Sequence, residues 1–272
     1  MGILFTGPMG TGQDFVRRSL RQRMRFDDDQ IEEFSLEVGR RDGRQLEKIL
    51  GVIRAIGQVV VIIDEGDRAF GNMTAKATAA LSRVIARIKE FMSDTANRGR
   101  ILFLVMTDRP DKLDVDLKRA GRLDRKIPFL YSQTPEEVER VAAAQVRKNR
   151  INTEVDFAAL RADFSSKLVG YSNADVEAVI LMANDDAARQ AGDAQSASDQ
   201  TRPEPLVTAE HFLRAATDYF PSRDADLLEY MELLAVFETS SRRLLPAKYA
   251  AMMPEELDAR LRQLRAVIGV RR

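Results

Sequence analysis

A glycine-rich turn near the N-terminus has the spacing of a phosphate-binding loop. The sequence GPMGTGQD fills residues 7–14, after an apolar segment at 3–6 and before a segment of helical character at 13–24. Glycines let backbone N–H groups converge on a phosphate, and a helix that begins there adds a favourable dipole. An ordinary strand-to-helix turn is the alternative. We therefore predict phosphate contacts at the residues of this loop, which are Gly7, Pro8, Met9, Gly10, Thr11, Gly12, Gln13 and Asp14.

Two adjacent acids follow the next apolar run. VVVII at 59–63 is a continuous β-branched segment, typical of a parallel strand that is covered on both faces. Asp64 and Glu65 come directly after it, at the strand end that would lie beside the phosphate loop. There Asp64 could bind Mg²⁺ through water, and Glu65 could polarise an attacking water. The alternative is two acids at the solvent end of a strand.

A third segment completes a recognisable set of motifs. TDRPDKLDVDLKRAGRLDR at 107–125 follows the apolar run ILFLVM at 101–106. Together with GPMGTG, VVVIIDE and GYSNAD at 170–175, it resembles the AAA (AAA+) family of ATPases. The family's second region of homology runs roughly TNRP, LD, RPGRFDR, and its helical lid carries GYSGAD. The resemblance covers about residues 1–220 and implies a P-loop NTPase fold that uses ATP or ADP with Mg²⁺.

The resemblance assigns roles to the acids and to the lid motif. Asp64 and Glu65 match the Walker B pair, and Asp108 takes the sensor position, where the family usually has Asn. In the lid motif, Gly170 and Asn173 are expected to contact nucleotide.

The resemblance also assigns roles to the arginines of the third segment. Arg122 and Arg125 match the arginine fingers, which reach the nucleotide site of a neighbouring subunit and stabilise charge on the transferred phosphoryl. Arg119 matches another basic position of the motif. An ordinary charged loop is the alternative.

The phosphate loop departs from the family at its last two positions. Gln13 replaces a lysine, and a lost charge-assisted bond of about 1.5–3 kcal/mol predicts roughly 10- to 100-fold weaker triphosphate binding. Asp14 replaces a Ser or Thr, and a carboxylate about 5 Å from a phosphate oxygen costs roughly 3 kcal/mol at an effective dielectric near 20. Asp14 would also satisfy the helix N-terminus. Alternatively, Asp14 could be a direct Mg²⁺ ligand, which would offset the repulsion.

Two further positions depart from the family pattern. A charged Asp108 should disfavour a nearby γ-phosphate unless it is protonated or paired. Unfolding members of the family place an aromatic residue before a Val-Gly in the central pore, whereas SLEVGRRDG at 35–43 has no aromatic residue and has Glu37 near that position. Aromatic gripping of a threaded polypeptide is therefore not expected.

The order of apolar patterns predicts the elements that position these residues. Strand-like runs alternate with helical segments at 44–56 and 74–92, which predicts an α/β fold with a parallel sheet flanked by helices. After residue 131 the pattern is helical, beginning with TPEEVERVAAAQVRKN. We expect a nucleotide-binding subdomain at 1–131, an all-helical lid at 132–221 and a helical extension at 222–272 that packs on the lid or contacts a partner. The chain starts on the first strand, so we expect it to be part of a longer polypeptide.

Composition excludes several classes of site. Lys plus Arg and Asp plus Glu both number 42, which gives no global attraction to nucleic acid or to an acidic membrane. The absence of cysteine excludes disulfides and thiolate metal sites, and a single histidine, His211, excludes a multi-histidine cluster. Without a long apolar run or a secretory signal, a cytoplasmic protein is expected.

Two functions remain open. The first is a module of a ring-shaped protein-remodelling assembly, hexameric as the family implies. It would be impaired in hydrolysis and would contribute structure and arginines to an active AAA+ neighbour. The second is an active ATPase that remodels an unknown protein client through a non-standard phosphate loop, with Asp14 supporting the metal.

Overall fold

The computed structural model describes residues 2–13, 15–16, 19, 31–34, 43–67, 79–193, 205–221 and 224–270. Asp14 and all of the pore-like segment 35–43 except Gly43 lie outside these ranges. The chain forms two compact units. The first comprises Met1–Pro8, Gln13–Phe129 and Asp226–Arg272, and the second comprises Met9–Gly12 and Leu130–Ala225.

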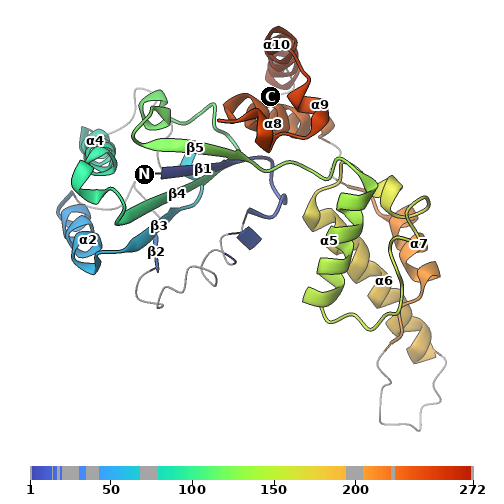
Figure 1. The fold of residues 1–272 in the computed structure, drawn as a ribbon. Coiled ribbons are helices and arrows are strands. Elements are labelled where there is room, and N and C mark those ends of the chain that lie inside the picture. Colours follow the sequence, from blue (N-terminus) through green and yellow to red (C-terminus); the bar gives the residue numbers. More distant parts are fainter. Residues whose placement is uncertain are drawn as a thin grey trace. The chain divides into compact units, whose positions relative to one another are not determined.

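The first unit is built on a parallel five-stranded sheet (Figure 1). Its strand order is β2-β3-β4-β1-β5, with every neighbouring pair parallel. The predicted α/β fold is confirmed. The sequence patterns missed β2 and β5, because IEEF and LDRKIP carry charged residues and form no apolar run. The strands are β1 (Gly2–Thr6), β2 (Ile31–Phe34), β3 (Val59–Ile63), β4 (Ile101–Thr107) and β5 (Leu123–Pro128).

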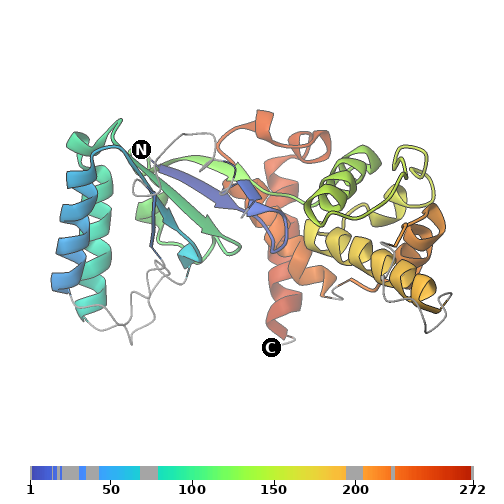
Figure 2. The ribbon, with the colours of Figure 1, turned by 90° about the horizontal axis from the view of Figure 1, so that it is seen from below.

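Two helices cover one face of this sheet, where they lie side by side (Figure 2). They are α2 (Gly43–Ile56) and α4 (Ala79–Ser93), close to the predicted helices. Alternate residues of β3 point to opposite faces, as its period of two requires. Val59, Val61 and Ile63 join the core under α2 and α4, whereas Val60 and Ile62 join a second cluster with Phe5, Leu104 and Met106.

The second unit is helical around its own core. Phe157, Phe164 and Phe212 meet at its centre, with ring centroids 5.2–6.1 Å apart. The single histidine, His211, is buried, and its Nδ1 accepts the Thr208 N–H at 3.0 Å at the start of a helix. The histidine is therefore a helix cap. The helices are α5 (Pro135–Lys148), α6 (Asn173–Asp193) and α7 (Ala209–Asp218), with a 3₁₀ turn at Ser165–Leu168.

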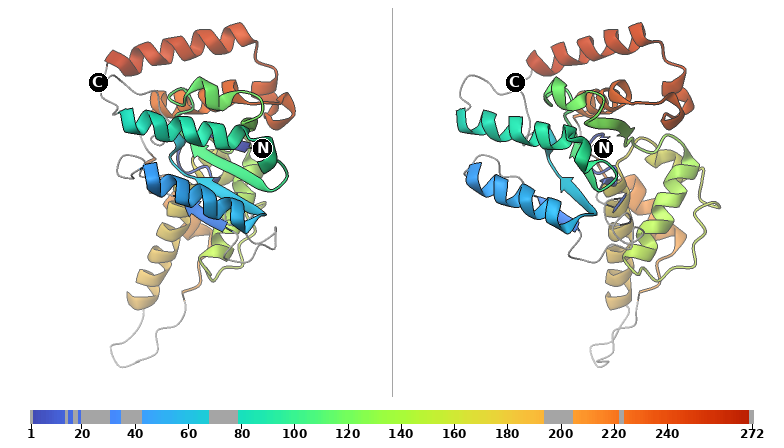
Figure 3. Two further views of the ribbon diagram at one scale, coloured as in Figure 1. Left: turned by 90° about the vertical axis from the view of Figure 1, so that its left-hand side faces the viewer. Right: turned by 60° about the vertical axis from the view of Figure 1, so that its left-hand side comes forward.

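The C-terminal extension belongs to the first unit. It contains α8 (Ala225–Glu238), α9 (Ala247–Ala250) and α10 (Pro254–Val270). Helix α10 lies over α8, where Arg260 donates to both carboxylate oxygens of Glu229 at 2.8 and 2.7 Å (Figure 3). The sequence favoured packing of the extension on the lid, whereas the hydrogen bonds of α8 with Asp111, Lys118 and Lys126 join it to the α/β part. None of the described helices has the length and apolar character needed to cross a membrane.

Candidate nucleotide site

The carboxyl ends of three strands meet at one edge of the sheet. The register places Thr6 beside Thr107 and Ile63 beside Val105. Because the strands are parallel, the residues that follow β1, β3 and β4 come to this edge together, at the position where open α/β sheets bind ligands. These residues are Gly7, Asp64 and Asp108, each of which the sequence assigned to the site.

The backbone of the phosphate loop requires its glycines. A Cβ atom on Gly7 would lie 1.9 Å from the carbonyl oxygen of Phe129, so no other residue fits there. Gly10 and Gly12 have φ angles of 77° and 93°, a region that glycine adopts without steric cost. The loop therefore has the backbone freedom that the predicted phosphate cradle needs.

The side chain of Gln13 turns back onto its own loop. Its Nε2 donates a hydrogen bond of 3.1 Å to the carbonyl oxygen of Gly7, in a partly buried position. Gln13, at the position of the family's lysine, thus bonds the end of the loop to its beginning through an amide and brings no positive charge.

The lid holds the tip of the loop within the second unit. Three successive carbonyl oxygens accept hydrogen bonds from it. The hydroxyl of Tyr131 donates to Met9 at 3.4 Å, the N–H of Ala174 to Gly10 at 3.3 Å, and the Nδ2 of Asn173 to Thr11 at 2.9 Å. Asn173, predicted to contact nucleotide, thus contacts the loop itself.

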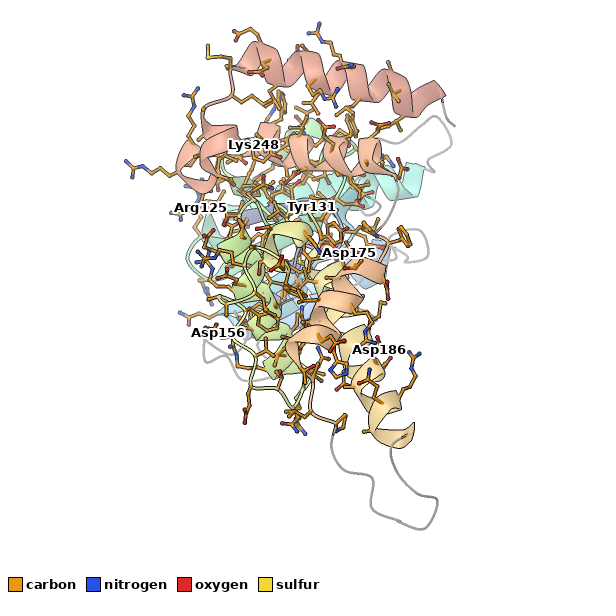
Figure 4. The ribbon with its side chains drawn as sticks, turned by 90° about the vertical axis from the view of Figure 1, so that its right-hand side faces the viewer. Arg125, Tyr131, Asp156, Asp175, Asp186 and Lys248 are labelled. Atoms are coloured by element: carbon orange, nitrogen blue, oxygen red, sulfur yellow. The ribbon has the colours of Figure 1, made fainter. Side chains whose placement is uncertain are left out.

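The first turn of α6 is fixed by a reciprocal cap. The N–H and hydroxyl of Ser172 donate to Asp175 Oδ2 at 3.0 and 2.6 Å, and the Asp175 N–H donates to the Ser172 hydroxyl. Tyr219 donates to the other oxygen of Asp175, which lies in this turn (Figure 4). Burial and then this carboxylate raise the pKa of Tyr219 to about 12. Gly170, at φ 84°, makes the preceding turn and donates its N–H to the Ser132 carbonyl at 2.9 Å.

The acid pair after β3 has an unusual backbone. Asp64 and Glu65 are exposed, and Asp64 Oδ1 accepts the Glu65 N–H at 2.8 Å. Glu65 has a φ of 49°, a left-handed conformation that costs a residue with a side chain on the order of 1–3 kcal/mol. The next residue, Gly66, is buried, and a Cβ there would lie 2.6 Å from Val105 Cγ1. Strain of this kind gathers at functional positions, which agrees with the predicted role of Glu65.

Asp108 lies near another acid that the sequence did not single out. Burial, and next the charge of Asp67, raise the pKa of Asp108. Asp67 Oδ1 accepts the hydroxyl of the buried Thr107 at 2.8 Å. In the sequence, Asp67 is marked only by its place as the third acid of DEGD at 64–67. Within the described part of the chain, no group of three or more His, Cys, Asp or Glu residues is arranged to hold a metal ion, so the metal role of Asp64 stays a prediction.

The arginines of the third motif differ in their surroundings. Arg122 is held by its own chain, with Nε donating to the Ser93 hydroxyl and Nη1 to the Asp116 carbonyl, both at 2.7 Å. Arg119 has a side chain that is 72% exposed, and it pairs with the Asp116 carboxylate at 3.1 Å. Arg125 lies exposed on β5, where Figure 4 labels it. Asp124, which precedes Arg125 in the sequence, accepts the N–H of Gly121 through its side chain.

Comparison with known proteins identifies the α/β part. The model of the family "ATPase family associated with various cellular activities (AAA)" matches residues 3–131. Residues 3–131 are an AAA-family domain. Members of this family in general use a nucleotide with Mg²⁺.

Several relatives align beyond the AAA domain. The ATPase family gene 2 protein of Schizosaccharomyces pombe is 29% identical over 182 residues, 66% of this chain and 22% of that protein. The ATPase family protein 2 homolog of Caenorhabditis elegans is 28% identical over 232 residues, 84% of this chain and 30% of its own. The 26S proteasome regulatory subunit 10B homolog A of Arabidopsis thaliana is 26% identical over 167 residues, which are 58% of this chain and 41% of that protein. The chain thus spans less than half of the length of each of these relatives.

The AAA domain fits a phosphate chain only in part. Its backbone fits, because Gly10 and Gly12 adopt the positive φ angles that the glycine-rich turn of a phosphate loop uses. Its side chains do not, because Gln13 supplies a neutral donor that is already bonded, and Asp108 places a carboxyl group at the edge where the γ-phosphate is expected.

Proposed function

We propose that this AAA domain is a hydrolysis-impaired module of a ring-shaped protein-remodelling assembly. It contributes structure, and it offers arginines to a neighbour with an intact site. The observation that carries the proposal is the hydrogen bond from Gln13 Nε2 to the Gly7 carbonyl, which leaves the loop closed by a neutral side chain. The missing charge-assisted bond weakens triphosphate binding roughly 10- to 100-fold.

The proposed ring is homo- or hetero-oligomeric and hexameric, as the AAA resemblance implies. Support for an assembly comes from the Arabidopsis relative, which is by name a subunit of a larger particle. The neighbour is an active AAA domain or subunit, and the client is a protein. The exposure of the Arg125 side chain supports a role for it outside its own chain.

One observation favours the second function, an active ATPase with a non-standard loop. The acid pair Asp64–Glu65 is present, and Glu65 adopts a strained backbone conformation that an idle position would not need. In that case Asp14, outside the described residues, would support the metal.

Turnover by the purified chain separates the two functions. We expect its ATP hydrolysis with Mg²⁺ to equal that of Glu65→Gln, because the loop lacks both a cation and a hydroxyl at residues 13 and 14. Glu136→Gln, an exposed glutamate on α5, controls for the loss of one carboxylate. Turnover that disappears in Glu65→Gln and persists in Glu136→Gln would establish the active ATPase instead.

A further inference from the structure

One carboxylate bridges the two ends of the arginine loop, defined as residues 119–125. Lys118 precedes this loop and Lys126 follows it. Both lysines bind Glu238, the last residue of α8: Lys118 Nζ contacts Oε1, and Lys126 Nζ lies 3.1 Å from Oε2. The Glu238 side chain is only 9% exposed, so this bridge is shielded from solvent far more than an ordinary surface ion pair.

The chain after α8 adds backbone bonds at the same place. The N–H of Ser240 donates to the Lys126 carbonyl at 3.2 Å, and the N–H of Lys126 donates to the Ser240 hydroxyl at 3.2 Å. At the other end of the loop, Lys118 Nζ also donates to the Pro110 carbonyl at 3.1 Å. The C-terminal extension therefore ties both ends of the arginine loop through side chains and, on β5, through the backbone.

Helix α8 also contacts the segment that leads from Asp108 to the arginine loop. The Tyr230 hydroxyl donates to Asp111 Oδ2 at 3.3 Å, and the Arg109 guanidinium lies 5.6 Å from the centre of the Tyr230 ring. Arg109 and Asp111 pair with each other at 2.9 Å. One helix thus contacts the segment after Asp108 with Tyr230, and the two lysines that flank the arginine loop with Glu238.

We propose that Glu238 is a positioning residue for the arginine loop. Its carboxylate holds Lys118 and Lys126 at a fixed spacing, and through them the extension sets where Arg122 and Arg125 are presented. Without this charge, two poorly exposed ammonium groups would lose their shared partner, and a partly buried charge that loses its partner is strongly unfavourable. The use of the arginines by a neighbour rests on the proposed function, whereas the positioning does not.

Amide hydrogen exchange of the full chain tests the positioning. Glu238→Gln keeps the shape of the side chain and removes its charge. Glu229→Gln is the matched control, because it breaks another ion pair of the same helix, the pair with Arg260. We expect amide exchange at residues 119–126 to become about tenfold faster or more in Glu238→Gln, an effect of the size measured for residues in direct contact. In Glu229→Gln, exchange in the same segment should stay unchanged.

The amides of β3 and β4 separate this local effect from general unfolding. If Glu238→Gln accelerates them as well, Lys126→Gln is used instead, because it removes one lysine and leaves the Lys118–Glu238 contact in place. A local acceleration at 119–126 in either variant supports the inference. Unchanged exchange in that segment, or equal acceleration by Glu229→Gln, overturns it.

Turnover of the complete assembly then gives the functional consequence. We expect Glu238→Gln and Arg125→Ala alike to lower kcat and leave the KM for ATP unchanged, because under the proposed function the arginines act on a neighbour's transition state. A loss in Arg125→Ala alone, with none in Glu238→Gln despite accelerated exchange, overturns the positioning role. If neither variant loses turnover, the proposed function fails, while the exchange result still supports the structural bridge.

Discussion

The phosphate loop has a neutral side chain where the AAA motif has a cation, whereas the arginine loop carries both finger arginines of its motif. Gln13 turns inward onto the Gly7 carbonyl. The arginine loop is braced by its own chain: Arg122 bonds to Ser93 and Asp116, and Glu238 binds both flanking lysines. Under the proposed function, hydrolysis at the domain's own site and assistance to a neighbour would depend on separate residues, so mutation can separate the two.

The largest expected effect is on the arginine side of this comparison. In the complete assembly, Arg125→Ala should lower ATP turnover at the nucleotide sites that depend on this domain. The expected loss is on the order of 10³-fold, the low end of the range for arginine fingers. Arg122→Ala should also lower turnover, but it removes the bonds to Ser93 and Asp116 as well. Steady-state turnover with particle size held constant gives the measurement.

The exposed Arg119 offers a matched control for Arg125, since Arg119→Ala removes a neighbouring charge of the same loop. If Arg125→Ala and Arg122→Ala both keep the particle size and the turnover of the parent, the arginines only structure their own loop. The domain would then be a passive scaffold.

A smaller effect concerns the carboxyl group at the sensor position. Burial and the charge of Asp67 raise the pKa of Asp108, so the folded state favours its protonated form. That stability is fully present below the unfolded pKa and is lost as pH rises through the folded pKa. Asp108→Asn should therefore melt higher than the parent at pH near 7, because it removes a charge that the folded state disfavours.

Thermal melts at two pH values check this assignment. The gain from Asp108→Asn should disappear near pH 4 or below, where an ordinary Asp becomes protonated. Asp163→Asn, at an exposed aspartate of the lid, should show no such pH-dependent gain. An equal gain at both pH values would mean that the Asp108 charge is not what destabilises the folded state.

The sequence could predict what depends on local pattern. Apolar runs located β1, β3 and β4, and the motifs after them located Gly7, Asp64 and Asp108, because parallel strands bring their carboxyl ends to one edge. Contacts between distant segments could not be predicted. Asn173 meets Thr11 across 162 residues, and Glu238 meets Lys118 across 120, through hydrogen bonds and charges that leave no periodic signal.

Calorimetric titration of ATP in the presence of Mg²⁺ tests most directly whether the missing cation impairs the site. The parent chain is compared with the double variant Gln13→Lys, Asp14→Thr, which restores the family's residues at the end of the loop. We predict that ATP binds the variant at least about tenfold more tightly, because a charge-assisted bond is regained and a like-charge repulsion is removed. An unchanged affinity would contradict this explanation and would mean that another feature closes the site.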